Sequence, residues 1–170
     1  TAFSQYQHLE VLGGGTNSLP GDVMIQNELL LNGAVIRLDA FNLSVEDTAA
    51  VSGSFSNNSM VETNGSGQLY RRIDAPGTYQ YPIGSAAEYT PATVDVSSAN
   101  FSGAANDGIG FRAIDSAAPD QRDAAFSLQR YWQTSSNGIS SVSINSSFAY
   151  PQSEVNTSLE PQYIWGLYSS

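Results

Sequence analysis

The 170-residue chain contains neither cysteine nor lysine, and each absence excludes a class of protein. Without cysteine there is no disulfide framework and no thiolate metal site. Without lysine there is no Walker phosphate-binding loop and no Schiff-base lysine. The six basic residues are therefore all arginine, against sixteen Asp and Glu and a formal net charge of −10. A nucleic-acid partner is disfavoured, because neutralising phosphates needs clustered cations.

The chain also has little histidine and no long apolar run. His8 is the sole histidine, and the chain contains no G-x-S-x-G nucleophile motif. No run of about 18 apolar residues is present, so no membrane span is predicted. The sixteen acids supply carboxylate pairs by chance, and their abundance is no evidence for glycoside hydrolysis. We therefore expect a protein that is not an enzyme.

What the chain does have is a repeat of about 20 residues in its first third. Glycines close one recurring pattern, which reads Leu9-x-Val11-x-Gly13, Leu29-x-Leu31-x-Gly33 and Ala49-x-Val51-x-Gly53. Two further matches are Val23 and Ile25 with Leu43 and Val45, and Val35 with Phe55. Apolar residues in alternation, broken by Gly, Asn, Asp and Ser, predict short strands joined by turns. We predict a short right-handed parallel β-solenoid over residues 1–66, whose inward side chains stack from coil to coil.

Beyond the glycine-rich segment 64–67 the apolar alternation becomes longer. It runs through three groups, namely Tyr79, Tyr81 and Ile83; Phe126, Leu128 and Trp132; and Val142, Ile144, Phe148 and Tyr150. Turn signals lie between apolar runs at Ala75-Pro76-Gly77, Asn106-Asp107-Gly108 and Asn137-Gly138. Asn137-Gly138 is the strongest hairpin candidate. We predict an antiparallel β-sandwich over residues 67–170, so that the chain as a whole is all-β.

The segments around the expected junction carry a family resemblance. They are Asn64-Gly65-Ser66-Gly67, residues 69–73, 75–84 and 89–94, and Arg130-Tyr131-Trp132. Their order and spacing resemble a module of large surface proteins of the Bacteroidetes. The resemblance implies a secreted, multidomain protein exported by the type IX system, with a stalk or adhesin role. No sorting domain is recognisable, which suggests an excerpt of a longer polypeptide.

Two residues are candidates for modification. Asp47-Thr48-Ala49 and Asp115-Ser116-Ala117 match the Asp-Ser/Thr-apolar acceptor that the resemblance implies for periplasmic O-glycosylation. The predicted O-glycosylation sites are therefore Thr48 and Ser116.

Aromatic and acidic residues give two further candidate sites. Tyr131, Trp132 and Trp165 are predicted to form an aromatic contact surface, because neighbours in a strand point to opposite faces and one of Tyr131 and Trp132 must face outward. No cofactor is expected, with calcium as the alternative. Its ligands would come from Asn106-Asp107-Gly108 and Asp120-Gln121-Arg122-Asp123, although the spaced acids of an EF-hand are missing.

These observations favour a non-enzymatic structural or adhesive segment of a secreted cell-surface protein, acting as stalk or adhesin module. Its location would be extracellular or at the cell surface. Its partners would be neighbouring domains of the same polypeptide, identical subunits or glycans. Two alternatives stay open, a self-assembling subunit of an extracellular fibre and a carbohydrate-binding module.

Overall fold

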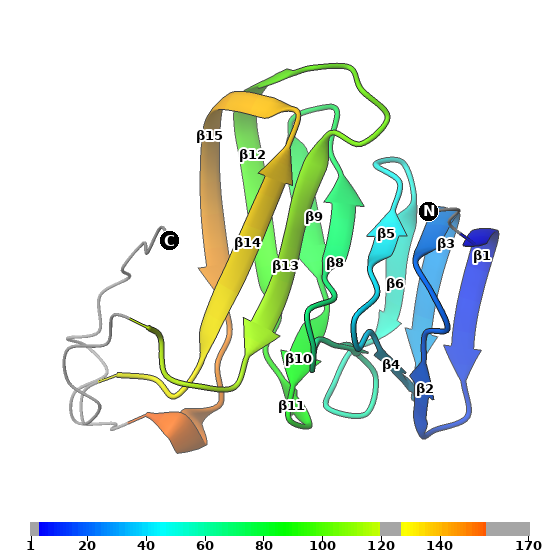
Figure 1. Ribbon diagram of the computed structural model, residues 1–170, viewed down its shortest axis with the longest axis vertical. Helices are drawn as coiled ribbons and strands as arrows, with labels where there is room; N and C mark the ends of the chain where they lie inside the picture. The colour runs from blue at the N-terminus through cyan, green and yellow to red at the C-terminus, as the bar shows by residue number, and fades with distance from the viewer. Residues whose placement is uncertain (1–3, 120–126, 156–170) are drawn as a thin grey trace.

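The computed structural model describes residues 4–119 and 127–155, and they form an all-β structure with a solenoid of about four coils (Figure 1). Each coil gives strands to a long sheet and a strand to a shorter one. The coil strands of the long sheet are β1 (Ser4–Leu12), β3 (Val23–Asn32), β5 (Leu43–Val45), β6 (Ala50–Ser54) and β8 (Leu69–Arg72). Those of the shorter sheet are β2 (Thr16–Ser18), β4 (Val35–Arg37), β7 (Val61–Glu62) and β10 (Ile83–Ser85). Successive coils pair in parallel throughout.

Apolar side chains stack in columns from coil to coil. Val23 faces Leu43, and Leu43 faces Leu69. Ile25 faces Val45 in the neighbouring column, and all five side chains are buried. The predicted match of Val23 and Ile25 with Leu43 and Val45 is therefore confirmed. Each fully buried aliphatic side chain of this kind contributes about 1.5–3 kcal/mol to the stability of the fold.

The third coil departs from the predicted register. Val51, not Ala49, faces Leu29, and Gly53 faces Leu31. The predicted alignment of the third glycine repeat is therefore wrong by two residues. The cause is the turn between β5 and β6, which makes this coil longer than the second without disturbing the alternation of apolar residues.

A second extension follows within the same coil. The predicted match of Val35 with Phe55 is wrong, because the residues that pair with β4 are Val61 and Glu62 of β7, which face Ile36 and Arg37. Between β6 and β7, Ser56 and Ser59 exchange backbone hydrogen bonds of 3.1 and 2.9 Å in a tight turn. This turn adds residues outside the stacked columns.

Parallel stacking continues past the glycine-rich segment 64–67. Strand β8 pairs with β5 and β10 pairs with β7, both in parallel. The glycine-rich segment is a corner of the solenoid, where Gly67 N–H donates to the carbonyl of Asp39 at 3.0 Å. Strand β10 then turns back into β11 (Glu88–Tyr89), forming a two-residue hairpin.

Antiparallel strands complete the structure. Strands β13 (Gly108–Ile114) and β14 (Tyr131–Asn137) extend the long sheet beyond β8. A third sheet contains β9 (Gly77–Tyr81), β12 (Ala92–Phe101) and β15 (Ile139–Phe148), and it lies behind β13 and β14 in Figure 1. A short 3₁₀ helix, η2 (Gln152–Glu154), follows β15. The predicted fold class, an all-β chain with a parallel solenoid followed by an antiparallel sandwich, is confirmed.

Aromatic rings fill the space between the two sheets of the sandwich. The ring centroid of Phe111 lies 4.7 Å from that of Tyr81 and 5.8 Å from that of Phe148. On β15, however, Val142 and Ile144 are 43% and 41% exposed. Alternation places them on the same face as Phe148, but of these three residues it is Phe148 that packs against the core. The apolar alternation of β15 therefore does not mark buried positions along the whole strand.

The three predicted turns all connect strands of different sheets. They join β8 to β9, β12 to β13 and β14 to β15. The predicted hairpin at Asn137-Gly138 is wrong, because β14 pairs with β13 whereas β15 pairs with β12. The chain does reverse at these positions, but it crosses from one sheet to the other. Turn residues permit a reversal, and they do not decide which strand becomes the hydrogen-bonded neighbour.

Asp107 organises two of these crossings. One of its carboxylate oxygens accepts from the Ser102 hydroxyl, and the other accepts from Gly103 N–H at 2.7 Å. Ser102 N–H in turn donates to the Gly138 carbonyl at 2.8 Å. The hydrogen bond from Ser102, followed by the backbone hydrogen bonds, lowers the pKa of Asp107. The carboxylate thus holds the β12–β13 crossing, and the backbone hydrogen bond from Ser102 ties this crossing to the β14–β15 crossing at the upper end of Figure 1.

We expect Gly53→Ala to lower the free energy of unfolding by about 3 kcal/mol. Gly53 has a φ of +125°, and an added Cβ would lie 1.8 Å from the carbonyl oxygen of Leu31 in the preceding coil. Gly21→Ala is the matched control, because nothing lies within 4 Å of its added Cβ and its φ is not positive. Urea denaturation measures both changes. Equal free energies for the two variants would contradict the register described for the third coil.

We expect Asp107→Asn to destabilise the protein at pH 7 and to matter progressively less in acid. A carboxylate with a lowered folded-state pKa contributes stability above its unfolded pKa of about 3.9, and this contribution is lost as the pH falls through the folded value. Urea denaturation at pH 7, 5 and 3 should therefore show the difference from wild type shrinking below about pH 4. The exposed Asp95 on β12 offers the control Asp95→Asn. A deficit that is constant from pH 7 to 3 would refute this role of the Asp107 charge.

Candidate binding cleft

A polar cleft of about 550 Å³ lies where the shorter solenoid sheet meets the sandwich. Its walls come from the ends of β4 and β7, the corner at 63–65, the β10–β11 turn, the end of β13 and the start of β14. This volume falls in the range of small-molecule binding sites. Its lining is mostly charged and polar, with Ala86 and Ile114 as the aliphatic members.

An ion pair between adjacent coils forms one wall. Strands β4 and β7 pair in parallel so that Arg37 faces Glu62. The Nε of Arg37 lies 2.7 Å from the Oε2 of Glu62, whose side chain is 9% exposed. The hydrogen bond and the charge of Glu62 raise the pKa of Arg37. Stacking of the coils, rather than local sequence spacing, brings these two residues together.

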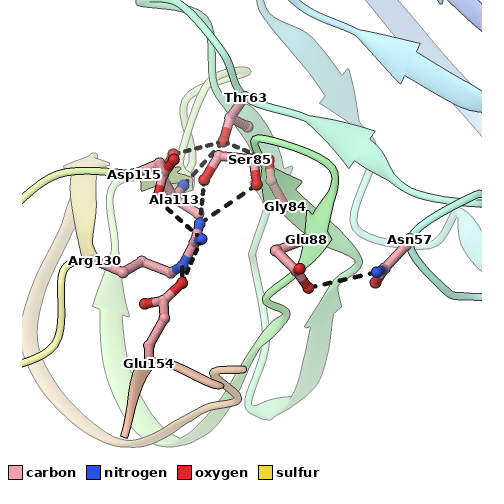
Figure 2. A network of polar contacts seen from close by, with 9 residues as sticks. All are labelled: Asn57, Thr63, Gly84, Ser85, Glu88, Ala113, Asp115, Arg130 and Glu154. Carbon is pink, nitrogen blue, oxygen red and sulfur yellow. Dashed lines mark hydrogen bonds and ion pairs between the residues drawn. The ribbon is translucent and has the colours of Figure 1, made fainter. Parts of the chain in front are cut away.

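Thr63 connects the solenoid to the sandwich at the back of the cleft (Figure 2). Its hydroxyl lies 3.1 Å from the carbonyl oxygen of Gly84 and 3.0 Å from that of Ala113, and it can donate to either. The hydroxyl oxygen also accepts from Ala113 N–H at 3.0 Å. Thr63 is 3% exposed, so water cannot replace these partners. One side chain therefore links strands β10 and β13 to the end of β7.

Arg130 forms a buried polar cluster beside Thr63 (Figure 2). Its side chain is 1% exposed, and its guanidinium lies 3.2 Å from Asp115 Oδ1 and 2.8 Å from Glu154 Oε1. It also donates to the hydroxyl of Ser85 on β10. Two carboxylates thus compensate the charge of Arg130. The cluster fixes the positions of Ser85 and Asp115, which both line the cleft.

Arg112 is the third arginine of this region. Its Nη1 donates to the carbonyl of Gly65 at 2.6 Å, and its Nε donates to Gln133 Oε1 at 2.7 Å. The antiparallel register of β13 and β14 places Gln133 opposite Arg112. Both acceptors are neutral. Within residues 4–119 and 127–155, no carboxylate lies within 4 Å of the Arg112 guanidinium.

Tyr131 and Trp132 of the predicted aromatic surface lie in different surroundings. Tyr131 lines the cleft. Trp132 packs into the sandwich, where its ring lies 5.0 Å from that of Phe148 and its Nε1 donates to the Thr90 carbonyl at 3.0 Å. Trp165 lies outside the described residues. Of the three, Tyr131 is therefore the one that the structure places at a candidate binding site.

The predicted modification sites lie apart from the cleft lining. Thr48 is exposed in the turn between β5 and β6, and Ser116 is exposed just after β13. Both hydroxyls are thus accessible at turns, where an acceptor segment can be bound by a glycosyltransferase. O-glycosylation of Thr48 and Ser116 stays a prediction.

The structure describes one of the two segments considered for calcium, residues 106–108. Asp107 uses both carboxylate oxygens for hydrogen bonds to Ser102 and Gly103. The segment 120–123 lies outside the described residues. In the described part of the chain, no three or more His, Cys, Asp or Glu side chains are grouped so as to hold a metal ion.

Tyr131 is one of the three aromatic residues named from the sequence, whereas the arginines around the cleft and their acidic partners were not predicted. Arg37 pairs with a residue of the following coil, and Arg130 pairs with residues before and after it in other segments. No local spacing predicts such pairs. The one available signal was the scarcity of cations, since every arginine in so acidic a chain is worth locating.

Comparisons with protein-family models, with curated proteins and with solved structures find no match for this chain. Among the described residues, no helix has the length and apolar character needed to cross a membrane. The resemblance to Bacteroidetes surface modules therefore stays a prediction. The fold and the cleft supply the evidence on which a function can be argued.

We expect Thr63→Val to lower the free energy of unfolding by about 2 kcal/mol, because it leaves the buried N–H of Ala113 without its acceptor. Thr78→Val is the matched control, since Thr78 is an exposed strand residue whose hydroxyl donates to Asp95. Urea denaturation of both variants measures the difference. If Thr63→Val is as stable as Thr78→Val, the hydroxyl does not hold the solenoid against the sandwich.

Proposed function

We propose that this chain is a non-enzymatic structural or adhesive segment of a secreted cell-surface protein, acting as a stalk or adhesin module. The observation that carries the proposal is the unbroken hydrogen-bonded path β1-β3-β5-β8-β13-β14, which runs through solenoid and sandwich alike. Buried residues from both parts belong to one hydrophobic core. A structure built in this way resists bending between its parts, which is what a spacer between other domains requires.

Side chains outside the core add further links between coils. Asp22 Oδ1 accepts from Asn42 N–H at 2.8 Å, and Asn42 Oδ1 accepts from Gln68 N–H at 3.0 Å. These residues occupy equivalent corners of successive coils. A repeated corner of this kind strengthens the stack and requires no ligand or substrate. It supports a structural role.

The first test is the intact mass of the native polypeptide that carries this sequence, together with its accessibility to protease on intact source cells. We expect a mass much larger than the 18.1 kDa of these residues and cleavage by added protease without cell lysis. A mass close to 18.1 kDa would contradict a stalk within a larger protein. Protection from protease on intact cells, with cleavage after lysis as the control, would contradict surface display.

A second candidate function, self-assembly into a fibre, is favoured by strand β1. It is an edge strand of the long sheet, it pairs with β3 on one side, and Tyr6 and Leu12 on it are 46% and 53% exposed. An open strand edge with exposed apolar side chains is a template for pairing with another chain. Sedimentation velocity over a range of concentrations separates the two functions. Growth of large species that Leu12→Lys suppresses would favour the fibre, and a constant monomer would favour the stalk.

A further inference from the structure

The distribution of positive charge singles out the polar cleft. The chain has six arginines and no lysine against sixteen acids. Arg37 and Arg112 line the cleft, and Arg130 lies behind its lining residues Ser85 and Asp115. Three of the scarce cations thus gather around one cavity. In a protein of net charge −10 such a grouping needs an explanation.

Two of the three arginines are already compensated. Arg37 is paired with Glu62, and Arg130 is paired with Asp115 and Glu154. Arg112 has neutral acceptors only among the described residues, namely the Gly65 carbonyl and the Gln133 amide oxygen. These two hydrogen bonds orient the guanidinium and use two of its five N–H donors. The remaining donors are available to a planar anion such as a carboxylate, which a guanidinium recognises with two parallel hydrogen bonds.

The rest of the lining suits a hydroxylated ligand. The Asn64 amide is held in place by Asp39, whose N–H donates to its Oδ1 and whose Oδ1 accepts from its Nδ2, which leaves one N–H of the amide for a ligand. Asp115 is 46% exposed, and its Oδ2 is left as an acceptor because Oδ1 faces Arg130. Tyr131 supplies an aromatic ring in the same lining. Polar side chains with an aromatic ring fit a sugar better than an aliphatic acid. A multiply charged group such as a phosphate is disfavoured relative to a singly charged carboxylate, since Glu62 and Asp115 lie in the same cleft and the whole protein is acidic.

We propose that this cleft binds a hexuronic acid unit of an acidic polysaccharide, with its carboxylate on Arg112 and its ring against Tyr131. This inference goes beyond the structural role, and it is independent of it, because the cleft lies on the structure whether or not the chain serves as a stalk. For a chain that acts as an adhesin module, it names the class of sugar that the module would bind. The single carboxylate of each sugar matches Arg112, the one arginine of the cleft that has no carboxylate partner among the described residues.

The experiment is a titration of the ¹⁵N-labelled protein with a galacturonic acid disaccharide, followed through the arginine Nε–H signals by NMR. Six arginines give six such signals, and Arg112→Gln identifies its own. We expect a saturable shift of the Arg112 signal below about 10 mM ligand, and little shift with the neutral galactose disaccharide. Binding should weaken as salt is raised, because a charge pair at a partly open site is screened.

Arg112→Gln should weaken binding at least tenfold, about the contribution of one hydrogen bond to a charged group. Arg72→Gln is the matched control, since Arg72 pairs with Glu46 outside the cleft lining, and it should bind like wild type. Thermal unfolding without ligand shows whether each variant folds. If Arg112→Gln does not fold, the wild-type titration still decides, because the Arg112 Nε–H signal can be assigned in the wild-type protein by its nuclear Overhauser effect to the side-chain amide of Gln133, whose Oε1 accepts from that Nε.

Three results would overturn the proposal. The first is no saturable shift of the Arg112 signal with the acidic disaccharide. The second is an equal response to the neutral disaccharide, which would remove the role of the carboxylate. The third is equally tight binding of acetate, which would leave a simple anion site without sugar recognition.

Discussion

The structure depends on strand β8, because this short strand is paired on both edges in opposite senses. On one edge it continues the parallel stack from β5, and on the other it begins the antiparallel sandwich with β13. Leu69 on β8 faces Leu43 on one side and Phe111 on the other, so the apolar column of the solenoid runs directly into the aromatic core of the sandwich. Without β8 the coils would end in an open edge and the sandwich would lose its connection to them. The cleft exists for the same reason, since it lies where the two types of pairing meet.

Sequence predicted the architecture because burial leaves a trace in the alternation of apolar residues. The predicted match of Val23 and Ile25 with Leu43 and Val45 was correct, because the same number of residues separates the two partners in each pair. The register of the third coil was wrong because the extra residues in the turn between β5 and β6 leave the alternation of the strands unchanged. The turn at Ser56 and Ser59 displaces the predicted match of Val35 with Phe55 in the same way. Asn137-Gly138 shows a second limit, because a turn signal specifies local backbone conformation whereas the choice of sheet is made by packing of strands β14 and β15 against different neighbours. Ile144 shows a third limit, because it shares the alternation of Phe148 on β15 and is nevertheless 41% exposed.

The cleft was much less predictable than the fold. Alternation required one of Tyr131 and Trp132 to face outward but did not say which, and it is Tyr131 that lines the cleft. The partner of Arg37 could not be found in this way, since Glu62 reaches it only through the uneven length of the third coil. Arg71 illustrates the same difficulty within the core. It occupies the column position between Val45 and Ile109, where burial lowers its pKa, and its guanidinium lies over the ring of Tyr79. Sequence alternation treats such an arginine as a solvent-facing residue.

The crossings between sheets also determine how the chain must fold. Within the sandwich, none of the three turns joins two strands that become hydrogen-bonded neighbours. Strand β12 has one partner that is near in sequence and one that is far, because Ala92 faces Tyr81 of β9 on one side and Phe148 of β15 on the other. Closing long loops costs entropy before any contact repays it, and proteins dominated by distant pairings fold in milliseconds to seconds. We therefore expect β9 and β12 to pair before β15 joins them. Until β15 pairs, the second edge of β12 is open to another chain.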